Sequence, residues 1–351
     1  MKPIRFREVR RRLLAFGFVE VGQAGSHVKF IKVTDVGSRV CMVPKHRESS
    51  FRYNSQYSKS GRSFRKGILK TLDDPMANSP ITNALTIDFE DWYQGIEIPY
   101  SDWDKYEDRI EMVGDKLLKI LDDAGAKATF FMLGYVAEKH PEIVKRIEAE
   151  GHEIGTHGFS HTLIYKQEPA LFQEELTRAI GFLEDLTGKK VLGHRAPFFS
   201  ITKDSLWALD ILGELGIKYD SSIFPVLNYR YGIADAPRFP YTIKREKFEF
   251  VEFPISTLKL PGFTMPISGG AYFRIYPYQV TKQAIKAVNR EGQPVTFYLH
   301  PWELDPDHPR IDVPRRIALT HYFNLGATEW RLKKLLKDFK MAPMGEVLGI
   351  S

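Results

Sequence analysis

Two histidines four residues apart are the residues of this chain best suited to chemistry. They are His157 and His161, in the segment Glu153-Ile-Gly-Thr-His-Gly-Phe-Ser-His161. Two neutral imidazoles and one carboxylate hold a divalent cation and leave coordination positions open. Such a cation lowers the pKa of a bound water and polarises a carbonyl oxygen. The spacing therefore indicates a metal-dependent hydrolase.

Three other segments carry residues that suit the same chemistry. Upstream, Thr86-Ile-Asp-Phe-Glu-Asp-Trp92 is a short apolar stretch followed by three carboxylates. Downstream lie His194-Arg-Ala-Pro197 and Phe297-Tyr-Leu-His-Pro-Trp302. A carboxylate can take a proton from water, an arginine can orient that carboxylate, and a histidine can protonate a leaving amine. Together these segments indicate hydrolysis of an amide.

Alternating strand-like and helix-like segments surround these residues. Strands are predicted at 84–88, 128–133, 153–157, 191–195 and 295–300, and helices at 109–124, 141–151, 168–187 and 202–216. Repeated β-α units form a parallel sheet or barrel, with active groups at the carboxyl ends of the strands. Asp88, His157, Arg195 and His300 each lie where a predicted strand ends. The sequence thus predicts one site at one edge of an α/β fold.

The order of carboxylate, His-x3-His, Arg-x-Pro and Leu-His resembles that of the NodB-type polysaccharide deacetylases, carbohydrate esterase family 4. The resemblance covers roughly residues 80 to 349. It implies a distorted (β/α) barrel with fewer than eight regular units. It also implies metal-dependent release of acetate from the N-acetyl groups of an amino-sugar-containing polysaccharide or its precursor. The implied cofactor is a divalent ion, zinc first, with cobalt, manganese or nickel as alternatives.

The resemblance also assigns roles to residues. Asp88 is expected to be the general base, with Arg195 paired to it, and His300 the acid that protonates the leaving amine. His157 and His161 are expected to bind the metal. The third ligand is either Asp91 or Glu90, and Asp91 is favoured because the family usually places the metal-binding aspartate after the base.

Residues near these segments are candidates for holding the sugar. Aromatic faces suit the apolar faces of pyranose rings, which favours Trp92, Phe198 and Trp302. Pro197 is expected to fix the loop after Arg195. Asp220, in Tyr219-Asp-Ser-Ser222, resembles a further family motif and is expected to tune His300 or line the pocket.

Three later segments resemble one particular subfamily of these deacetylases. They are 269–274 (Gly-Gly-Ala-Tyr-Phe-Arg), 300–308 (His-Pro-Trp-Glu-Leu-Asp-Pro-Asp-His) and 321–324 (His-Tyr-Phe-Asn). They are similar to a deacetylase subfamily found in exopolysaccharide loci linked to exosortase (PEP-CTERM) systems. This similarity implies a bacterial enzyme of exopolysaccharide biosynthesis.

Charge divides the chain into two parts. Residues 1–72 hold 17 Lys and Arg against four acidic residues, whereas the rest holds 33 basic and 40 acidic residues. A small, strongly basic domain is typical of nucleic-acid binding. The polar segment 73–80 contains two prolines and is predicted to be a linker. We therefore expect a basic module at 1–72, a linker at 73–80 and the deacetylase-like domain at 81–351.

The basic module is predicted to have the order α-β-β-β-α, with helices at 6–16 and 64–72 and strands at 18–21, 27–33 and 39–43. Gly25-Ser-His-Val-Lys-Phe30, with the segments 43–46 and 66–72, resembles the HicA family of small toxin ribonucleases. Those proteins have a fold like that of double-stranded-RNA-binding domains. The resemblance implies that His27 is a general acid/base on RNA, and that RNA or an antitoxin-like protein is a partner. The polar insertion 48–62 departs from the family.

The resemblance to the deacetylase barrel leaves one other hydrolase interpretation open, and the charge asymmetry with His27 leaves a second. The barrel could hydrolyse a non-sugar carbon–nitrogen bond, or the chain could act through its N-terminal module as an RNA-binding or RNA-cleaving protein.

No stretch reaches the ~18 to 20 apolar residues of a membrane-spanning helix, and the basic N-terminus lacks the apolar core of a signal peptide. Cys41 is the only cysteine, which excludes an internal disulfide and suits a reducing cytoplasm.

Overall fold

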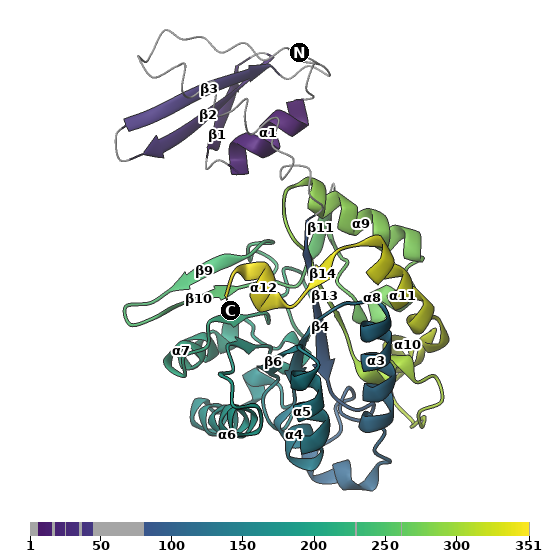
Figure 1. Cartoon of the computed structure of the whole chain (residues 1–351). Coiled ribbons are helices and arrows are strands. Elements are labelled where there is room, and N and C mark those ends of the chain that lie inside the picture. The colour runs from purple at the N-terminus through teal and green to yellow at the C-terminus, as the bar shows by residue number, and fades with distance from the viewer. Residues whose placement is uncertain are drawn as a thin grey trace. The chain divides into compact units, whose positions relative to one another are not determined.

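The computed structural model of the chain contains two compact units, 1–80 and 81–351, each with its own buried core. Figure 1 shows both units. The structure describes residues 6–15, 18–24, 26–34, 37–44, 81–228, 230–260 and 262–350.

The N-terminal unit is a helix beside a three-stranded antiparallel sheet. Helix α1 (Phe6–Ala15) precedes strands β1 (Val19–Ala24), β2 (His27–Thr34) and β3 (Gly37–Pro44), which pair in the order β1-β2-β3. The apolar positions of α1 recur at helical spacing, so one face of the helix can meet the sheet. The buried core of this unit comprises Val9, Leu13, Phe18, Val28, Phe30 and Val43.

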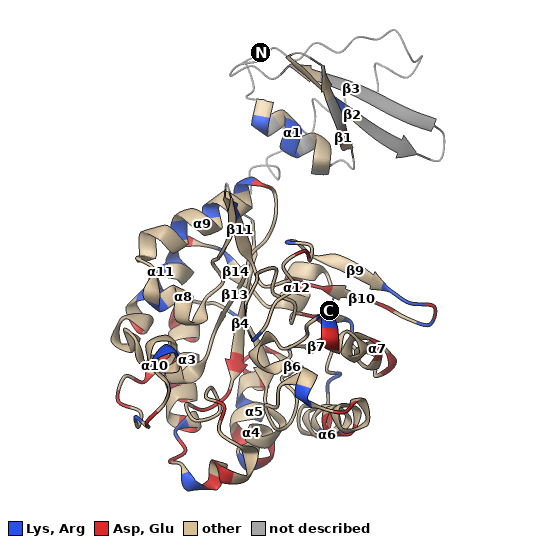
Figure 2. Ribbon diagram, turned by 180° about the vertical axis from the view of Figure 1, so that it is seen from behind, with Lys and Arg blue, Asp and Glu red and all other residues tan. Residues whose placement is uncertain are grey.

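These elements confirm the predicted first helix and the three predicted strands. Basic residues on α1 are blue in Figure 2, as expected for a module rich in lysine and arginine. The predicted closing helix at 64–72, the insertion at 48–62 and the linker at 73–80 lie outside the described residues.

The C-terminal unit is built on one curved, largely parallel sheet. Its strands are paired in the order β13-β4-β5-β6-β7-β8-β10-β9, and β14 pairs with the start of β4. Only the β10–β9 pairing is antiparallel among the described strands of this sheet. The bounds are β4 (Asn83–Phe89), β5 (Thr129–Met132), β6 (Glu153–Thr156), β7 (Gly193–His194), β8 (Tyr219–Asp220), β9 (Tyr241–Lys244), β10 (Glu249–Glu252), β13 (Thr296–Leu299) and β14 (Met341–Ala342).

Helices surround this sheet (Figure 1). They are α3 (Ile110–Asp123), α4 (Gly134–Lys139), α5 (Pro141–Ala149), α6 (Pro169–Thr187), α7 (Trp207–Glu214), α8 (Gly270–Ile275), α9 (Tyr278–Arg290), α10 (Arg315–Tyr322), α11 (Thr328–Asp338) and α12 (Met344–Leu348). In α3, Val113, Leu117 and Leu121 recur every four residues and are buried. This apolar stripe packs in the same core as β4 and fixes the helix on the sheet.

Alternation along the strands sorts their side chains onto two faces. In β4, Leu85, Ile87 and Phe89 join the large core that includes α3, whereas Thr86 and Asp88 project to the other face. The inner face is crowded. A Cβ atom at Gly193 of β7 would lie 2.2 Å from the ring of Tyr219, so only glycine fits there. The functional side chains project to this inner face.

The predicted strands and helices between residues 84 and 216 are all confirmed, as is the strand near 295–300, with ends that differ by a few residues. The sequence predicts no elements between residues 221 and 290. These residues hold β9 and β10, a second hairpin of β11 (Thr257–Leu260) and β12 (Phe263–Pro266), and helices α8 and α9.

Candidate active site

Polar side chains meet where the parallel strands of the C-terminal unit end. Asp88 lies near the end of β4, and His157, Arg195 and His300 directly follow β6, β7 and β13. Figure 2 shows an acidic position near the end of β4. The side chains of Asp88, His157 and Arg195 are at most 3% exposed, but that of His300 is 18% exposed. His300 is therefore the most exposed of these four side chains.

Arg195 holds Asp88 in one orientation. Its Nη1 donates to Asp88 Oδ1 at 2.7 Å and to the hydroxyl of Thr86 at 2.7 Å. Its Nε and Nη2 donate to the backbone oxygen and the hydroxyl of Ser221 at 3.0 and 2.9 Å. The guanidinium also lies 4.4 Å from the ring centre of Phe131. A planar group fixed at so many points can hold a carboxylate more rigidly than a lysine would.

Glu90, His157 and His161 form a candidate metal site. One ligand atom from each lies within 4.8 Å of the others, and all three residues are buried. Glu90 Oε2 is 2.5 Å from Nε2 of His161 and 3.9 Å from Nε2 of His157. Yet this oxygen has no hydrogen-bond partner of good geometry among the described residues. An orphaned buried carboxylate oxygen beside two imidazoles fits a divalent cation.

The protonation of this cluster suits a cation. Burial lowers the pKa of His157 to about 4, so its imidazole is neutral near pH 7. Its Nδ1 lies 2.7 Å from the backbone oxygen of Arg195, which places the proton on Nδ1 and leaves the Nε2 lone pair free. Burial alone would favour the neutral acid of Glu90, but His161 lowers the pKa of Glu90 to about 2. Glu90 is therefore ionised.

Asp91, the favoured third ligand, lies elsewhere, and this choice is corrected to Glu90. Its Oδ1 accepts from the backbone N–H of Trp92 at 2.7 Å, and its Oδ2 from that of Arg109 at 2.6 Å. Burial raises the pKa of Asp91 to about 7. The reason is alternation: Asp88 and Glu90 are two residues apart and project together, whereas Asp91 turns toward the start of α3.

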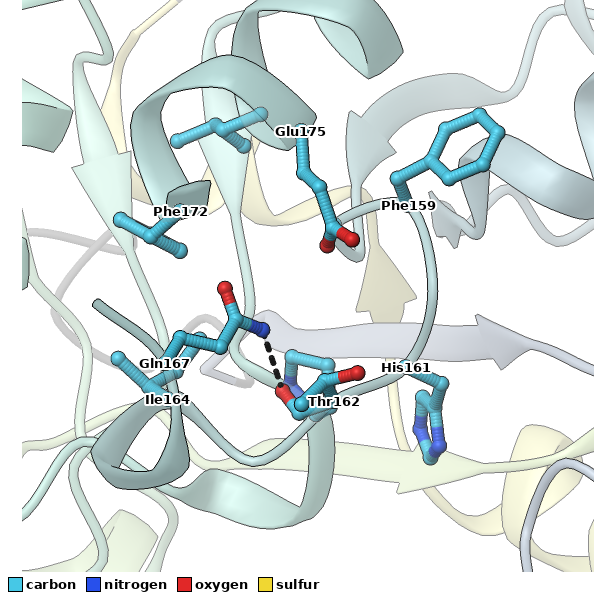
Figure 3. Close-up of a pocket in the computed structure, with 10 residues that line it drawn as sticks. Phe159, His161, Thr162, Ile164, Gln167, Phe172 and Glu175 are labelled. Atoms are coloured by element: carbon cyan, nitrogen blue, oxygen red, sulfur yellow. Dashed lines mark hydrogen bonds between the residues drawn. The ribbon is translucent and has the colours of Figure 1, made fainter. Parts of the chain in front are cut away.

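A network behind the metal site holds the loop that carries His161. The hydroxyl of Ser160 donates to Glu175 of α6 at 2.8 Å, and Gln167 Nε2 donates to the backbone oxygen of Thr162 at 3.1 Å. Figure 3 shows Glu175 directed toward this loop and the bond between Gln167 and Thr162. His161 has a φ of 53°, a region that non-glycine residues rarely adopt. Such strain persists only where the surroundings enforce it, and it is typical of functional sites.

His300 is oriented by a buried ion-pair chain. Its Nδ1 lies 2.9 Å from Glu303 Oε1, and Glu303 Oε2 accepts from Arg274 Nε at 2.6 Å. Arg274 also donates to the backbone oxygens of three residues at the end of α10 and just beyond: Thr320, His321 and Phe323. This leaves Nε2 of His300 facing Glu90 Oε1 at 3.7 Å and Asp88 Oδ2 at 3.9 Å.

This chain also sets the charge of His300. Burial favours the neutral ring, but the hydrogen bond to Glu303 and the nearby carboxylates raise the pKa of His300 to about 9. Burial likewise opposes the charge of Glu303, but Arg274 and His300 lower the pKa of Glu303 to about 2. His300 is therefore a protonated donor near pH 7, as a general acid must be.

Asp220 does not contact His300, which corrects the expectation that it tunes that histidine. Its Oδ1 lies 2.7 Å from Nδ1 of His194 and accepts from Ser222 at 2.6 Å. His194 and Asp220 are register partners on β7 and β8, and the His194 ring contacts Phe172 of α6. They belong to the face that meets the helices, opposite the face that carries Arg195.

The predicted sugar-binding residues divide into two groups. Trp92 is 1% exposed and donates from its indole N–H to the backbone oxygen of Glu107, which corrects its assignment to the substrate. Trp302 is also buried; its ring stacks on His300, and its indole N–H donates to Glu90 at 3.3 Å. It supports the catalytic side chains.

Pro197 and Phe198 differ in exposure although they are adjacent. Pro197 is buried at the start of η4 (Pro197–Phe199). Phe198 is partly exposed, and its ring centre lies 4.5 Å from that of His161. Phe198 is therefore placed to meet a substrate beside the candidate metal site.

In the N-terminal unit, His27 is exposed at the start of β2. Its Nδ1 lies 3.3 Å from the hydroxyl of Ser26. The exposed position leaves the ring accessible to solvent.

Family models match three segments of the chain. Residues 98–219 match "Polysaccharide deacetylase", residues 221–349 match "Domain of unknown function (DUF3473)", and residues 6–50 match "HicA toxin of bacterial toxin-antitoxin". The chain is 38% identical over 118 residues to a peptidoglycan-N-acetylglucosamine deacetylase of Bacillus cereus, which covers 30% of this chain and 43% of that protein.

Residues 98–219 are thus similar to polysaccharide deacetylases. The chain is also 37% identical over 110 residues to a peptidoglycan deacetylase-like protein of Gibberella zeae, covering 31% of this chain and 32% of that protein. The chain thus spans under half the length of these two relatives. The matches support a hydrolase of carbon–nitrogen bonds in the deacetylase class.

A solved structure supports the fold of the C-terminal unit. A protein of Mycobacterium smegmatis described as a polysaccharide deacetylase has a TM-score of 0.51 and 21% identity, over 77% of this chain and 92% of that chain. This likeness supports an α/β fold built on a curved sheet covered by helices. No helix among the described residues is long and apolar enough to cross a membrane.

The two matched segments of the C-terminal unit each carry part of the site, and Asp88 and Glu90 precede both segments. The segment 98–219 carries His157, His161 and Arg195, whereas the segment of unknown function, 221–349, carries His300 and its ion-pair chain. Glu303 and Arg274 were not predicted as site residues. The sequence does contain a signal for Glu303: it lies three residues after His300, a spacing at which its side chain can reach back to His300.

Proposed function

We propose that this chain is a metal-dependent N-deacetylase that releases acetate from an N-acetylated amino-sugar polymer or its precursor. One observation carries the proposal: Glu90, His157 and His161 meet beside the Asp88–Arg195 pair, with a protonated His300 across from them. Base, acid and ligand set therefore surround one space at the end of the sheet.

Glu90, His157 and His161 would hold the cation, with zinc as the first candidate. The donor set of two imidazoles and one carboxylate is one that zinc uses in hydrolytic sites. When bound, the ion lowers the pKa of a water and polarises the amide carbonyl.

Asp88 and His300 would then move the protons. Asp88 accepts the proton of the attacking water, and Arg195 keeps its carboxylate turned toward that water. The tetrahedral centre collapses when the carbon–nitrogen bond breaks. His300 donates its Nε2 proton to the departing nitrogen, because an amine anion cannot leave unprotonated. Glu303 holds the ring so that Nε2, not Nδ1, faces the reacting atoms.

Acetate release from N-acetylglucosamine oligomers tests this proposal. We expect release that is lost after chelation and restored by zinc, with cobalt, manganese and nickel tested in parallel. Non-sugar cyclic amides serve as the comparison. Turnover of those amides in place of the oligomers would favour the other hydrolase interpretation.

A role in exopolysaccharide biosynthesis draws support from the three late segments. Arg274, Glu303 and His321 come from these segments and lie together behind His300: Arg274 binds Glu303 and the backbone oxygen of His321. The rings of Trp302 and His321 stack at 4.0 Å. The residues that carry the resemblance to the exosortase-linked subfamily thus lie around His300, the proposed general acid. Deletion of the gene and analysis of N-acetylation in the secreted polymer would test this role.

A second proposal concerns the N-terminal unit. The match over residues 6–50, the excess of basic residues and the exposed His27 support RNA binding, with His27 as acid/base. If phosphates supply the affinity, binding to RNA must weaken steeply as salt rises. His27→Ala is expected to remove cleavage but keep binding. A chain that starts at Met76 is expected to keep deacetylase activity, and an insoluble or inactive product would contradict the division at 73–80.

A further inference from the structure

A charged and aromatic cluster lies beside the candidate metal site. Glu97, Lys166, Phe198 and Arg230 follow β4, β6, β7 and β8, so four loops at the catalytic edge of the sheet supply it. Arg230 Nη1 donates to Glu97 at 2.7 Å, and Lys166 Nζ lies 3.5 Å from the other oxygen of Glu97. The Arg230 guanidinium lies 4.5 Å from the ring centre of Phe198.

Phe198 connects this cluster to the chemistry. Its ring contacts both His161 and Arg230. Its backbone has a φ of 52°, and that of Phe199 a φ of 54°, both in the left-handed region. Such conformations are rare in non-glycine residues and persist where the surrounding structure enforces them. Here they hold an aromatic ring against both a metal ligand candidate and a cation.

The charges of the cluster do not cancel. Two cations share one carboxylate, which leaves a net charge of about +1 by formal count. The side chains of Arg230 and Lys166 are 22% and 59% exposed, so solvent and ligands can reach both. Arg230 Nε is buried without a hydrogen-bond partner within the described part of the chain. A partly exposed guanidinium beside an aromatic ring suits an anionic group on a sugar.

We propose that Phe198, Arg230 and Lys166 form a subsite for an anionic group adjoining the acetamido sugar. The proposal rests on the deacetylase function proposed above and names its substrate class: an acidic, not a neutral, amino-sugar compound. The sugar ring lies against Phe198, and the anion pairs with the two cations. The anion is either the carboxylate of a neighbouring hexuronate in the polymer or the diphosphate of a nucleotide-activated precursor, and these two sources are separable by experiment.

Three probes distinguish the sources and the neutral case. They are chitotetraose, a heparosan tetrasaccharide with alternating glucuronate, and UDP-N-acetylglucosamine. The zinc-loaded full chain is expected to show a kcat/KM for one of the two anionic probes that is about tenfold or more above that for chitotetraose, the weight of one charge-assisted hydrogen bond. Preference for the tetrasaccharide identifies the carboxylate, and preference for the nucleotide identifies the diphosphate.

Arg230→Gln is expected to reduce this preference by about tenfold, mainly through KM, and Lys166→Gln to reduce it less. Arg245→Gln is the matched control. Arg245 lies on the β9–β10 hairpin and pairs with a single carboxylate, that of Asp210 on α7, at 2.6 Å. A preference for chitotetraose in the unmodified chain, or an anionic preference that Arg230→Gln leaves unchanged, would overturn the proposal. Calorimetric binding of the same probes tests the subsite even if no acetate is released. Absent turnover with anion-selective binding would reject the deacetylase function alone.

Discussion

Arg195 binds one carboxylate oxygen of Asp88 and leaves the other facing His300. The bond from Arg195 Nη1 to Asp88 Oδ1 is 2.7 Å, and Asp88 Oδ2 lies 3.9 Å from Nε2 of His300. The two oxygens therefore differ: one is held by Arg195, and the other is next to His300. In the proposed mechanism the second oxygen accepts the proton of the reacting water.

Asp88→Asn is expected to lower kcat by a factor on the order of 10² to 10⁴, the usual weight of general acid–base catalysis. The amide cannot accept the proton of water, yet it can keep the hydrogen bond from Arg195. Metal content, measured by elemental analysis, is expected to stay at the unmodified level because Asp88 is not one of the three ligand candidates. Activity close to that of the unmodified chain would refute the role of base.

Arg195→Met is expected to destabilise the deacetylase domain by about 3–5 kcal/mol, because it leaves the buried carboxylate of Asp88 without its partner. Urea unfolding followed by tryptophan fluorescence measures this loss. The double variant with Asp88→Asn removes the uncompensated charge and should recover part of the stability. A loss below about 1 kcal/mol would mean that the pair is of the weak, solvent-screened kind.

Glu303→Gln is expected to move the basic limb of the kcat profile to lower pH. In the unmodified chain the pKa of His300 is raised to about 9, so activity should fall as His300 loses its proton near that pH. Without the charge of Glu303 the pKa of His300 falls, and the limb should move by about one pH unit or more. Glu303→Asp tests the alternative that bulk alone matters. If the basic limbs of Glu303→Gln and Glu303→Asp fall at the same pH, the assignment of the raised pKa of His300 to the charge of Glu303 is contradicted.

Asp220→Asn provides the comparison for that experiment. Burial opposes the charge of Asp220, but its hydrogen bond with His194 lowers the pKa of the carboxyl. We expect the variant to unfold at lower urea concentration and to keep the basic limb where it was. Movement of the limb in Asp220→Asn would restore the expectation that Asp220 tunes His300.

The site could be predicted from the sequence wherever a strand and its last residue could be recognised. Asp88 lies near the end of β4, and His157, Arg195 and His300 directly follow β6, β7 and β13. Parallel pairing then brings their side chains to one edge. Glu90 was predictable in principle, because residues two apart on an extended strand share a face. Analogy with adjacent aspartates favoured Asp91, although the inserted phenylalanine at position 89 shifts the face by one residue.

Residues joined across long sequence separations could not be predicted in this way. Glu303 and Arg274 are 29 residues apart, and Arg230 and Glu97 are 133 apart. Each partner lies in a loop or short helix whose position depends on the packing of the whole barrel. Trp92 shows the converse: an aromatic residue beside catalytic carboxylates is core more often than it is a sugar platform.

The metal content of two neighbouring variants tests the central claim most directly. Glu90→Gln and Asp91→Asn each remove one negative charge, one residue apart, and each keeps the shape of the side chain. After dialysis against limiting zinc, we expect Asp91→Asn to retain about one zinc ion per chain and Glu90→Gln to lose most of it, because Glu90 and not Asp91 meets His157 and His161. Retention of zinc by Glu90→Gln together with its loss from Asp91→Asn would contradict the account.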